Sequence, residues 1–305
     1  MPRFLHPTLL ATALIMTAPA SAQEPPTRGA QAKAATGDTA QPAAPVFTLD
    51  AMNVFRRFEP RHTAKMVEFY HKVLGLRPLD PVQLDENQQI ILFGVGKGQI
   101  KLAAGLKEGR QHHLGDLHGV TGIRTLGLTY ADGEELAARF REAGYAAPEF
   151  RDIGNGRKAA LVEDPAGFRI ALTIAPDAED HPGVEVGVNV SDLERSRAFY
   201  RTFVGLEELA PVEDPLLGVT KYPFRLGETT ISLWSQGSGL PADTGSAGIQ
   251  YVINNVDAVN ASGLAQKVTV EEPLGGLPNF SVRFVWFNDP DGVTNYFAQV
   301  GSAPR

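Results

Sequence analysis

An internal repeat is the feature of this sequence that most limits how the chain can fold. The octapeptide FYHKVLGL at 69–76 returns as FYRTFVGL at 199–206, and the tetrapeptide DPAG at 164–167 returns as DPDG at 289–292. The two spacings, 130 and 125 residues, nearly agree and indicate duplication of a unit of about 125 residues. A polar segment that contains two prolines, 176–183, separates the copies.

Within each copy, strand and helix patterns follow one another in the order strand, helix, several strands, and then the same again. In the second copy, valines at every second position of 184–190 are typical of a strand, and Ser191-Asp192 supplies an N-cap for a helix. Helices are expected at 63–74, 133–143, 191–203 and 257–266. Strands are expected at 52–58, 89–93, 99–103, 124–130, 159–162, 168–173, 184–190, 229–234, 248–254, 281–287 and 293–299. The pattern predicts four βαβββ modules in two α+β domains, 47–175 and 183–300.

The N-terminus is typical of an exported protein. Arg3 and His6 precede an apolar stretch, and Ala20-Ser21-Ala22 follows it as a cleavage pattern, so residues 1–22 are interpreted as a signal peptide removed after Ala22. Residues 23–46 are rich in Pro, Ala, Gln and Thr and are expected to be a disordered linker. The mature protein is therefore expected to be secreted or periplasmic.

Composition narrows the classes of partner. The net charge of -7 argues against a nucleic-acid partner, which would need clustered Lys and Arg. The chain has no Cys, which excludes disulfides, thiolate metal sites and a cysteine nucleophile. No later apolar run is long enough to span a membrane, and a homodimer is left open. A small-molecule ligand is the expected partner.

Three motifs carry a family resemblance. FYHKVLGL (69–76), VNVSDLERSRAFY (188–200) and DPDG (289–292) resemble the vicinal oxygen chelate superfamily, which includes glyoxalases, bleomycin-resistance proteins and extradiol dioxygenases. The resemblance covers about 47–300. It implies two tandem glyoxalase-like domains, each built of paired βαβββ modules that form a curved mixed sheet.

The resemblance also implies where a site would lie. In metal-dependent relatives, donors on the first, fifth and eighth strands of a domain converge on a divalent ion. Counting from the motifs, the matching residues are Phe55, Thr125 and Ala171 in the first domain and Glu185, Gln250 and Tyr296 in the second. The first set cannot hold a metal, and the second lacks the two histidines of an extradiol dioxygenase. No cofactor is expected, and a divalent metal at Glu185 and Gln250 is the lesser alternative.

A polar cup in the second domain is therefore the predicted site. Glu185 would act there as a general base, Tyr296 as a hydrogen-bond donor to a developing oxyanion, and Gln250 as their partner. The predicted substrate-binding residues are Asn189, Thr294, Trp234 and Trp286; hydrophobic core is the alternative for the two tryptophans.

Two other groups of residues have open interpretations. His112, His113 and His118 lie in a Gly-containing loop, where they either bind a metal or are solvated. The pair Arg56-Arg57 either lines an anion-binding rim or forms salt bridges to Glu59.

The expected function is an exported glyoxalase-like lyase or isomerase that acts on, or binds, an oxygenated small molecule in the second-domain cup by proton transfer. Two alternatives remain open. One is a metal-free sequestration protein of the bleomycin-resistance type, and the other is a structural or interaction protein whose cups are filled by side chains.

Overall fold

A computed structural model describes residues 44–86, 88–277 and 280–301. The expected signal peptide (1–22) and nearly all of the expected linker (23–43 of 23–46) lie outside these residues. Among the helices in the described part of the chain, none has the length and apolar character needed to cross a membrane.

The described part of the first repeat contains eight strands and two helical segments, the first of which is made of three consecutive elements. Its helical elements are a 3₁₀ turn η1 (Pro60–His62), α1 (Thr63–Glu68), a π-helical segment η2 (Phe69–Val73) and α2 (Gly133–Glu142). Its strands are β1 (Asn53–Phe58), β2 (Arg77–Gln83), β3 (Gln89–Val95), β4 (Gly98–Ala104), β5 (Thr121–Tyr130), β6 (Arg151–Gly154), β7 (Arg157–Glu163) and β8 (Arg169–Ile174).

The second repeat has the same order with two additional short strands. Its helical elements are α3 (Leu193–Ala198), a π-helical segment η3 (Phe199–Val204) and α4 (Val256–Ala265). Its strands are β9 (Glu185–Asn189), β10 (Glu207–Glu208), β11 (Val212–Asp214), β12 (Val219–Leu226), β13 (Thr229–Trp234), β14 (Ala242–Asp243), β15 (Ala247–Val252), β16 (Val270–Leu277), β17 (Val282–Asn288) and β18 (Thr294–Val300).

Two of the described helices, α2 and α3, start at an aspartate N-cap. The Asp132 carboxylate accepts hydrogen bonds from the backbone N–H groups of Glu134 and Glu135, and Asp192 accepts one from Arg195 N–H. These contacts satisfy N–H groups that have no partner inside the helix. In both repeats the duplicated FY motif forms the π-helical end of the first helix and turns its Phe and Tyr into the core.

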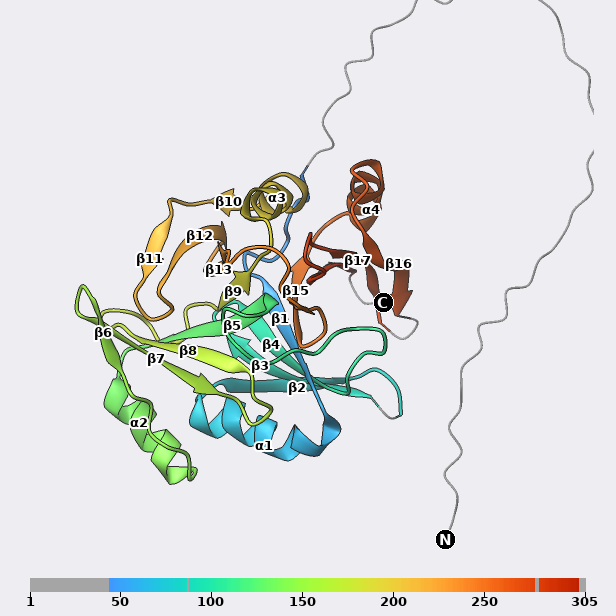
Figure 1. The fold of residues 1–305 in the computed structure, drawn as a ribbon. Coiled ribbons are helices and arrows are strands. Elements are labelled where there is room, and N and C mark those ends of the chain that lie inside the picture. Colours follow the sequence, from blue (N-terminus) through green and yellow to red (C-terminus); the bar gives the residue numbers. More distant parts are fainter. Residues whose placement is uncertain (1–43, 87, 278–279, 302–305) are drawn as a thin grey trace, which may run out of the picture. The chain divides into compact units, whose positions relative to one another are not determined.

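The strands assemble into two mixed sheets, and each sheet takes one module from each repeat. The eight-stranded sheet has the order β16-β17-β18-β15-β1-β4-β3-β2. The ten-stranded sheet has the order β10-β12-β13-β9-β5-β8-β7-β6, with β11 paired to β12 and β14 to β5. Figure 1 shows the join in the first sheet, where blue β1 lies beside orange β15.

This exchange of modules corrects an assumption of the sequence analysis. Each domain was expected to close its own cup, but the first module (β1–β4) pairs with the fourth (β15–β18), and the second (β5–β8) pairs with the third (β9–β13). The joins are antiparallel, with Asn53 opposite Gln250 in one sheet and Ile123 opposite Val188 in the other. Strand periodicity identifies a strand but carries no information on which distant strand will be its neighbour.

A buried ion pair connects the two sheets. Arg56 of β1 donates from Nε to the Asp164 carboxylate at 3.1 Å, and both side chains are almost completely buried. Asp164 lies in the turn between β7 and β8, within the second module, and also accepts a hydrogen bond from the Tyr70 hydroxyl. Removing either partner would leave a single buried charge, which is strongly destabilising. The pair therefore links the two modules of the first repeat across the sheets.

Candidate functional site

The eight-stranded sheet holds a cavity of about 370 Å³, which we call the aromatic pocket. Side chains along each strand point alternately toward the pocket and away from it. In β1, Phe55 and Arg57 face the pocket. The other face of β1 buries Val54, Arg56 and Phe58. The pocket is lined by Phe55, Arg57, Val82, Leu84, Gln88, Ile90, Leu92, Lys101, Ala103, Gln250, Leu277, Phe280, Val282, Phe284, Trp286, Tyr296, Ala298 and Val300.

Four rings form one wall of the aromatic pocket. Trp286 lies 5.2 Å from Tyr296 and 6.3 Å from Phe55, centroid to centroid, and Phe284 meets Tyr296 edge to face at 5.6 Å. The indole Nε1 of Trp286 is buried and has no hydrogen-bond partner among the described residues. This wall can pack against an apolar or aromatic ligand and leaves one N–H donor unused.

Gln250 and Tyr296 are neighbours on the floor of the aromatic pocket. They face each other across the β15–β18 pairing, and the Gln250 Oε1 accepts a hydrogen bond from Asn53 Nδ2 at 3.0 Å. Burial raises the pKa of Tyr296 to about 12, although a hydrogen bond to Gln250 acts in the opposite direction. The Tyr296 hydroxyl is therefore protonated at neutral pH and can donate a hydrogen bond to a ligand.

Two cations also face this pocket. Lys101 and Arg57 form no hydrogen bond or salt bridge through their side chains to any residue in the described part of the chain. Burial lowers the pKa of Lys101 to about 8. Burial also lowers the pKa of Arg57, and the charge of Glu271 acts in the opposite direction at longer range. Among the described lining residues there is no Asp or Glu, so the pocket has a net positive character.

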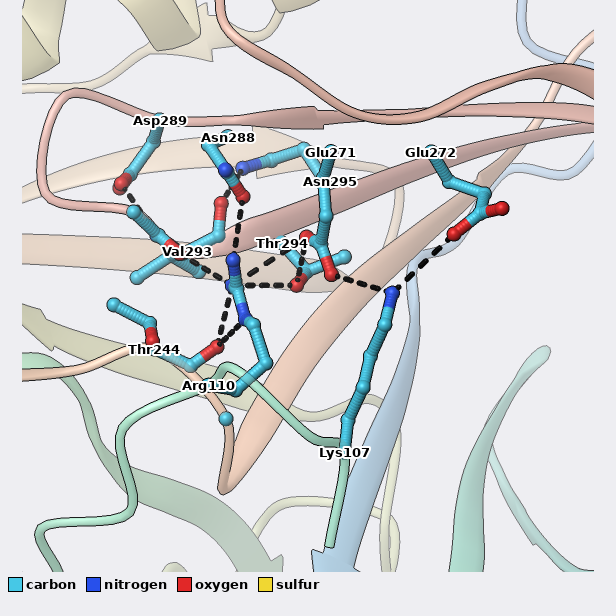
Figure 2. A network of polar contacts seen from close by, with 12 residues as sticks. Lys107, Arg110, Thr244, Glu271, Glu272, Asn288, Asp289, Val293, Thr294 and Asn295 are labelled. Atoms are coloured by element: carbon cyan, nitrogen blue, oxygen red, sulfur yellow. Dashed lines mark hydrogen bonds and ion pairs between the residues drawn. The ribbon is translucent and has the colours of Figure 1, made fainter. Parts of the chain in front are cut away.

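Glu271, the carboxylate that acts on Arg57 at longer range, is engaged in a polar network of its own (Figure 2). Lys107 and Arg110, from the loop between β4 and β5, contact the Glu271 carboxylate at 3.0 and 3.4 Å, and the Thr294 hydroxyl donates to it at 2.6 Å. Lys107 also lies 4.3 Å from the Trp286 ring centroid. This network holds the wall in place and leaves Arg57 and Lys101 without a close acidic partner.

The ten-stranded sheet holds a second cavity of about 350 Å³ with polar walls. Glu185 lines it, together with Asp214 and Lys221. Lys221 Nζ lies 2.7 Å from the Glu185 carboxylate and 2.5 Å from Asp214. Burial alone would lower the pKa of Lys221, but the two carboxylates raise it above the ordinary value. Glu185 is therefore the partner of a buried ammonium group.

The predicted meeting of Glu185, Gln250 and Tyr296 in one hollow is wrong. Gln250 and Tyr296 line the aromatic pocket, but Glu185 lies in the other sheet, in the second cavity. The same exchange separates Phe55, which lines the aromatic pocket, from Thr125 and Ala171 of the ten-stranded sheet. The modules that were assigned to one domain contribute to different sheets.

Two predicted substrate-binding residues line the site region, and two do not. Trp286 lines the aromatic pocket, and Thr294 lies behind it in the Glu271 network. Asn189 is buried and donates from Nδ2 to the Val120 carbonyl at 2.9 Å. Trp234 is 1% exposed in a small apolar cluster, which agrees with the alternative that this tryptophan belongs to the hydrophobic core. Buried contacts of this kind leave neither side chain available to a ligand.

The remaining candidates from the sequence, the Arg56-Arg57 pair and the loop histidines, do not form a common site either. Arg57 lines the aromatic pocket, whereas Arg56 pairs with Asp164, and Glu59 pairs with Arg61 instead. Both ring nitrogens of His112 are buried without a partner, but the described residues contain no group of three or more His, Cys, Asp or Glu that could hold a metal.

Lys101 is the pocket residue that the sequence analysis missed. In the segment GQIKLAA it alternates with buried Ile100 and Leu102, a pattern that is equally typical of a solvent-facing lysine on a strand. Only the docking of the fourth module over this face covers it.

Comparison with known proteins places this geometry in a family. The family described as the glyoxalase/bleomycin resistance protein/dioxygenase superfamily matches residues 60–172 and 183–297. The chain belongs to this superfamily. A lactoylglutathione lyase from Arabidopsis thaliana is 26% identical over 243 residues, which cover 75% of this chain and 84% of the relative.

Solved structures share the fold. Glyoxalase I from Zea mays matches with a TM-score of 0.63 and 20% identity, covering 82% of this chain and 92% of that chain. A putative dioxygenase from Bacillus subtilis matches with a TM-score of 0.59 and 15% identity, covering 86% and 87%. At these identities the likeness concerns the fold and not the reaction.

The donors present do not fit the divalent metal of metal-dependent relatives. Around the aromatic pocket, the strands that meet carry Phe55, Lys101, Gln250 and Tyr296, and two of these four groups are a phenyl ring and an ammonium. Hard divalent cations need several oxygen or imidazole donors without a positive neighbour. In the second cavity, the Lys221 ammonium already occupies the space between Glu185 and Asp214. No reaction step is therefore assigned to a metal.

Proposed function

We propose that the aromatic pocket binds an oxygenated organic anion with an apolar or aromatic body and supports a lyase- or isomerase-type proton transfer on it. The observation that carries the proposal is the presence of two inward-facing cations, Arg57 and Lys101, with no acid in the described lining. The relationship to a lactoylglutathione lyase supports the reaction class.

The unpaired charges point to the sign of the ligand. Burying a cation without a partner costs free energy, and a carboxylate or enolate that enters the pocket would recover part of it. Arg57, Lys101 and the Tyr296 hydroxyl are all hydrogen-bond donors that line the pocket. A ligand rich in acceptor oxygens at one end and apolar at the other matches this arrangement.

The same groups suit proton transfer next to a carbonyl group. Loss of such a proton places negative charge on the carbonyl oxygen, and preorganised donors and cations lower the free energy of that oxyanion. Glu185 cannot take the role of base here because it lies in the other sheet.

Binding of phenylacetate and of its neutral analogue phenylacetamide tests the charge preference. We expect phenylacetate to stabilise the protein against thermal unfolding by about 2.7 kcal/mol at a hundredfold excess over its dissociation constant, and phenylacetamide to have a much smaller effect. Arg57→Met should weaken phenylacetate binding at least tenfold, whereas the exposed control Arg61→Met should not. Equal binding of both compounds would remove the proposal.

Metal-free sequestration is the second candidate function, and the poor fit of Phe55 and Lys101 to a metal favours it. Solvent exchange separates the two functions. An enzyme should exchange the carbon-bound protons of a bound oxo acid for deuterium in D₂O, as followed by proton NMR. Tight binding with exchange no faster than in buffer indicates sequestration.

We also propose that the mature protein is exported, on the basis of the signal-like sequence of residues 1–22. N-terminal sequencing of protein recovered from the exported fraction should begin at Gln23. Recovery of the full chain from the cell interior alone would argue against export.

A further inference from the structure

The Lys101 amine differs from the other inward-facing lysine of the sheets. Lys221 is held between two carboxylates at 2.7 and 2.5 Å, and even Lys107, on the loop after β4, pairs with Glu271 and Glu272. Lys101 faces a cavity of about 370 Å³ and has no such partner among residues 44–86, 88–277 and 280–301. Its amine is therefore free to react with whatever occupies the pocket.

The surroundings make this amine a nucleophile at ordinary pH. Burial lowers the pKa of Lys101 to about 8, so about a tenth of the amines are neutral at pH 7, compared with fewer than one in a thousand for an ordinary lysine. Only the neutral form attacks a carbonyl carbon. The apolar rings of Phe55 and Trp286 line the same pocket as this amine.

Arg57 lies where it can hold the other end of a substrate. In the parallel pairing of β1 with β4, Phe55 is opposite Lys101 and Arg57 is opposite Ala103, so Arg57 and Lys101 are diagonal neighbours on one face. Two residues along a strand and one strand across correspond to roughly 7–8 Å between Cα atoms. Both side chains are long enough to reach one ligand that carries a carboxylate next to a carbonyl.

We propose that Lys101 is a covalent nucleophile that forms an imine with the carbonyl carbon of a 2-oxo acid, while Arg57 binds the carboxylate and the aromatic wall binds the side chain. This inference rests on the proposed function and names its substrate class and its reacting atom.

The imine step needs only the two partners. The Lys101 Nζ lone pair forms a bond to the carbonyl carbon, and the carbonyl electrons move to oxygen, which takes a proton to give a carbinolamine. Loss of that oxygen as water, with the second amine proton, leaves the imine, and addition of water reverses the sequence. The protonated imine withdraws electrons from the adjacent carbon and eases loss of a proton from that carbon to a water molecule, which is the requirement of lyase and isomerase chemistry.

Reductive trapping tests the proposal on the full chain. The protein is mixed with sodium cyanoborohydride and one of three probes, pyruvate, 2-oxobutyrate or phenylpyruvate, and the adduct is measured by intact mass and located by peptide mapping. We expect one adduct per chain, at Lys101, and more of it with phenylpyruvate than with pyruvate. No adduct at Lys101 with any probe, or adducts spread over surface lysines, would overturn the imine.

Lys101→Arg separates this inference from the proposed function. The variant keeps a positive charge but has no nucleophilic amine, so it should lose the adduct, while phenylacetate should still bind more tightly than phenylacetamide. Lys97→Arg, at an exposed position, is the matched control and should keep the adduct. If wild-type protein binds phenylacetate but traps no 2-oxo acid, only the imine fails. If it binds no anion, the proposed function fails as well.

Discussion

Asp164 and Asp289 occupy the same turn in the two repeats but have different neighbours. Asp164 pairs with Arg56, whereas the residue 130 positions after Arg56 is Val186. Within the described part of the chain Asp289 forms no salt bridge and accepts hydrogen bonds from Tyr200 and the backbone. Burial, with a contribution from Asp291, raises the pKa of Asp289 to about 7. The surroundings of the duplicated turn therefore differ at two positions, Arg56 against Val186 and Ala166 against Asp291.

This difference predicts a pH dependence of stability. Because the folded-state pKa of Asp289 lies above its unfolded value of 3.8, the folded protein binds this proton more tightly. The contribution of Asp289 to the free energy of unfolding is therefore fully present below about pH 4 and is lost as the pH rises to about 7, by at most about 1.4 kcal/mol per pH unit. Asp289→Asn should remove this slope in urea unfolding measured from pH 4 to 8.

Asp164→Asn is the matched control for that experiment. It leaves Arg56 buried without its charge partner, so it should lower the free energy of unfolding by about 3–5 kcal/mol at pH 7. An unchanged slope in Asp289→Asn, or the same response in both variants, would contradict the assignment.

At the scale of elements, the position of β15 against β1 shapes the aromatic pocket. Gly248 of β15 lies opposite Phe55, and a Cβ added to Gly248 would lie 2.1 Å from the Phe55 ring. Its φ is not positive, so the glycine is needed for space and not for backbone conformation. Gly248→Ala should push the ring into the pocket and weaken phenylacetate binding at least tenfold, as isothermal titration calorimetry would measure.

Gly144→Ala is the control that separates the effect of filling space in the pocket from the effect of replacing any glycine. Gly144 has open space around it, but its φ of +80° disfavours alanine, so this variant should lower stability without changing phenylacetate affinity. Unchanged affinity in Gly248→Ala would show that Phe55 does not limit the pocket.

The elements themselves could be predicted from the sequence because their signals are local. The alternation in 184–190 and the cap at Asp192 act within a few residues, and the strand β9 and the helix α3 lie where they were expected. Seven strands in the described part of the chain were not anticipated from the sequence: β2, β6, β10, β11, β12, β14 and β16. The three long ones, β2, β12 and β16, each contain proline, which weakens the strand signal.

At the scale of the whole molecule, the exchange of modules makes each repeat depend on the other. The chain 47–175 alone would expose the edges of β1 and β5, which pair with β15 and β9 in the intact protein. Exposed edges of this kind promote association. We expect this half to be aggregated, or dimeric through self-pairing, in light scattering, with no cooperative unfolding transition as a monomer.

Co-expression of 47–175 and 183–300 provides the complementary experiment. The two halves should copurify as a one-to-one complex, because both sheets require both partners. Two halves that each fold as stable monomers would contradict the strand order.

The sequence by itself determined the duplication and the α+β modules, because repeats and periodicity depend on separations along the chain. The family resemblance pointed to Gln250 and Tyr296, which line the aromatic pocket together with Trp286. Only the tertiary structure decided that Glu185 lies in a different sheet from these residues and that Lys101 joins them. Strand pairing between modules depends on which hydrophobic faces cover each other in three dimensions, and alternation along one strand is the same whichever partner covers it.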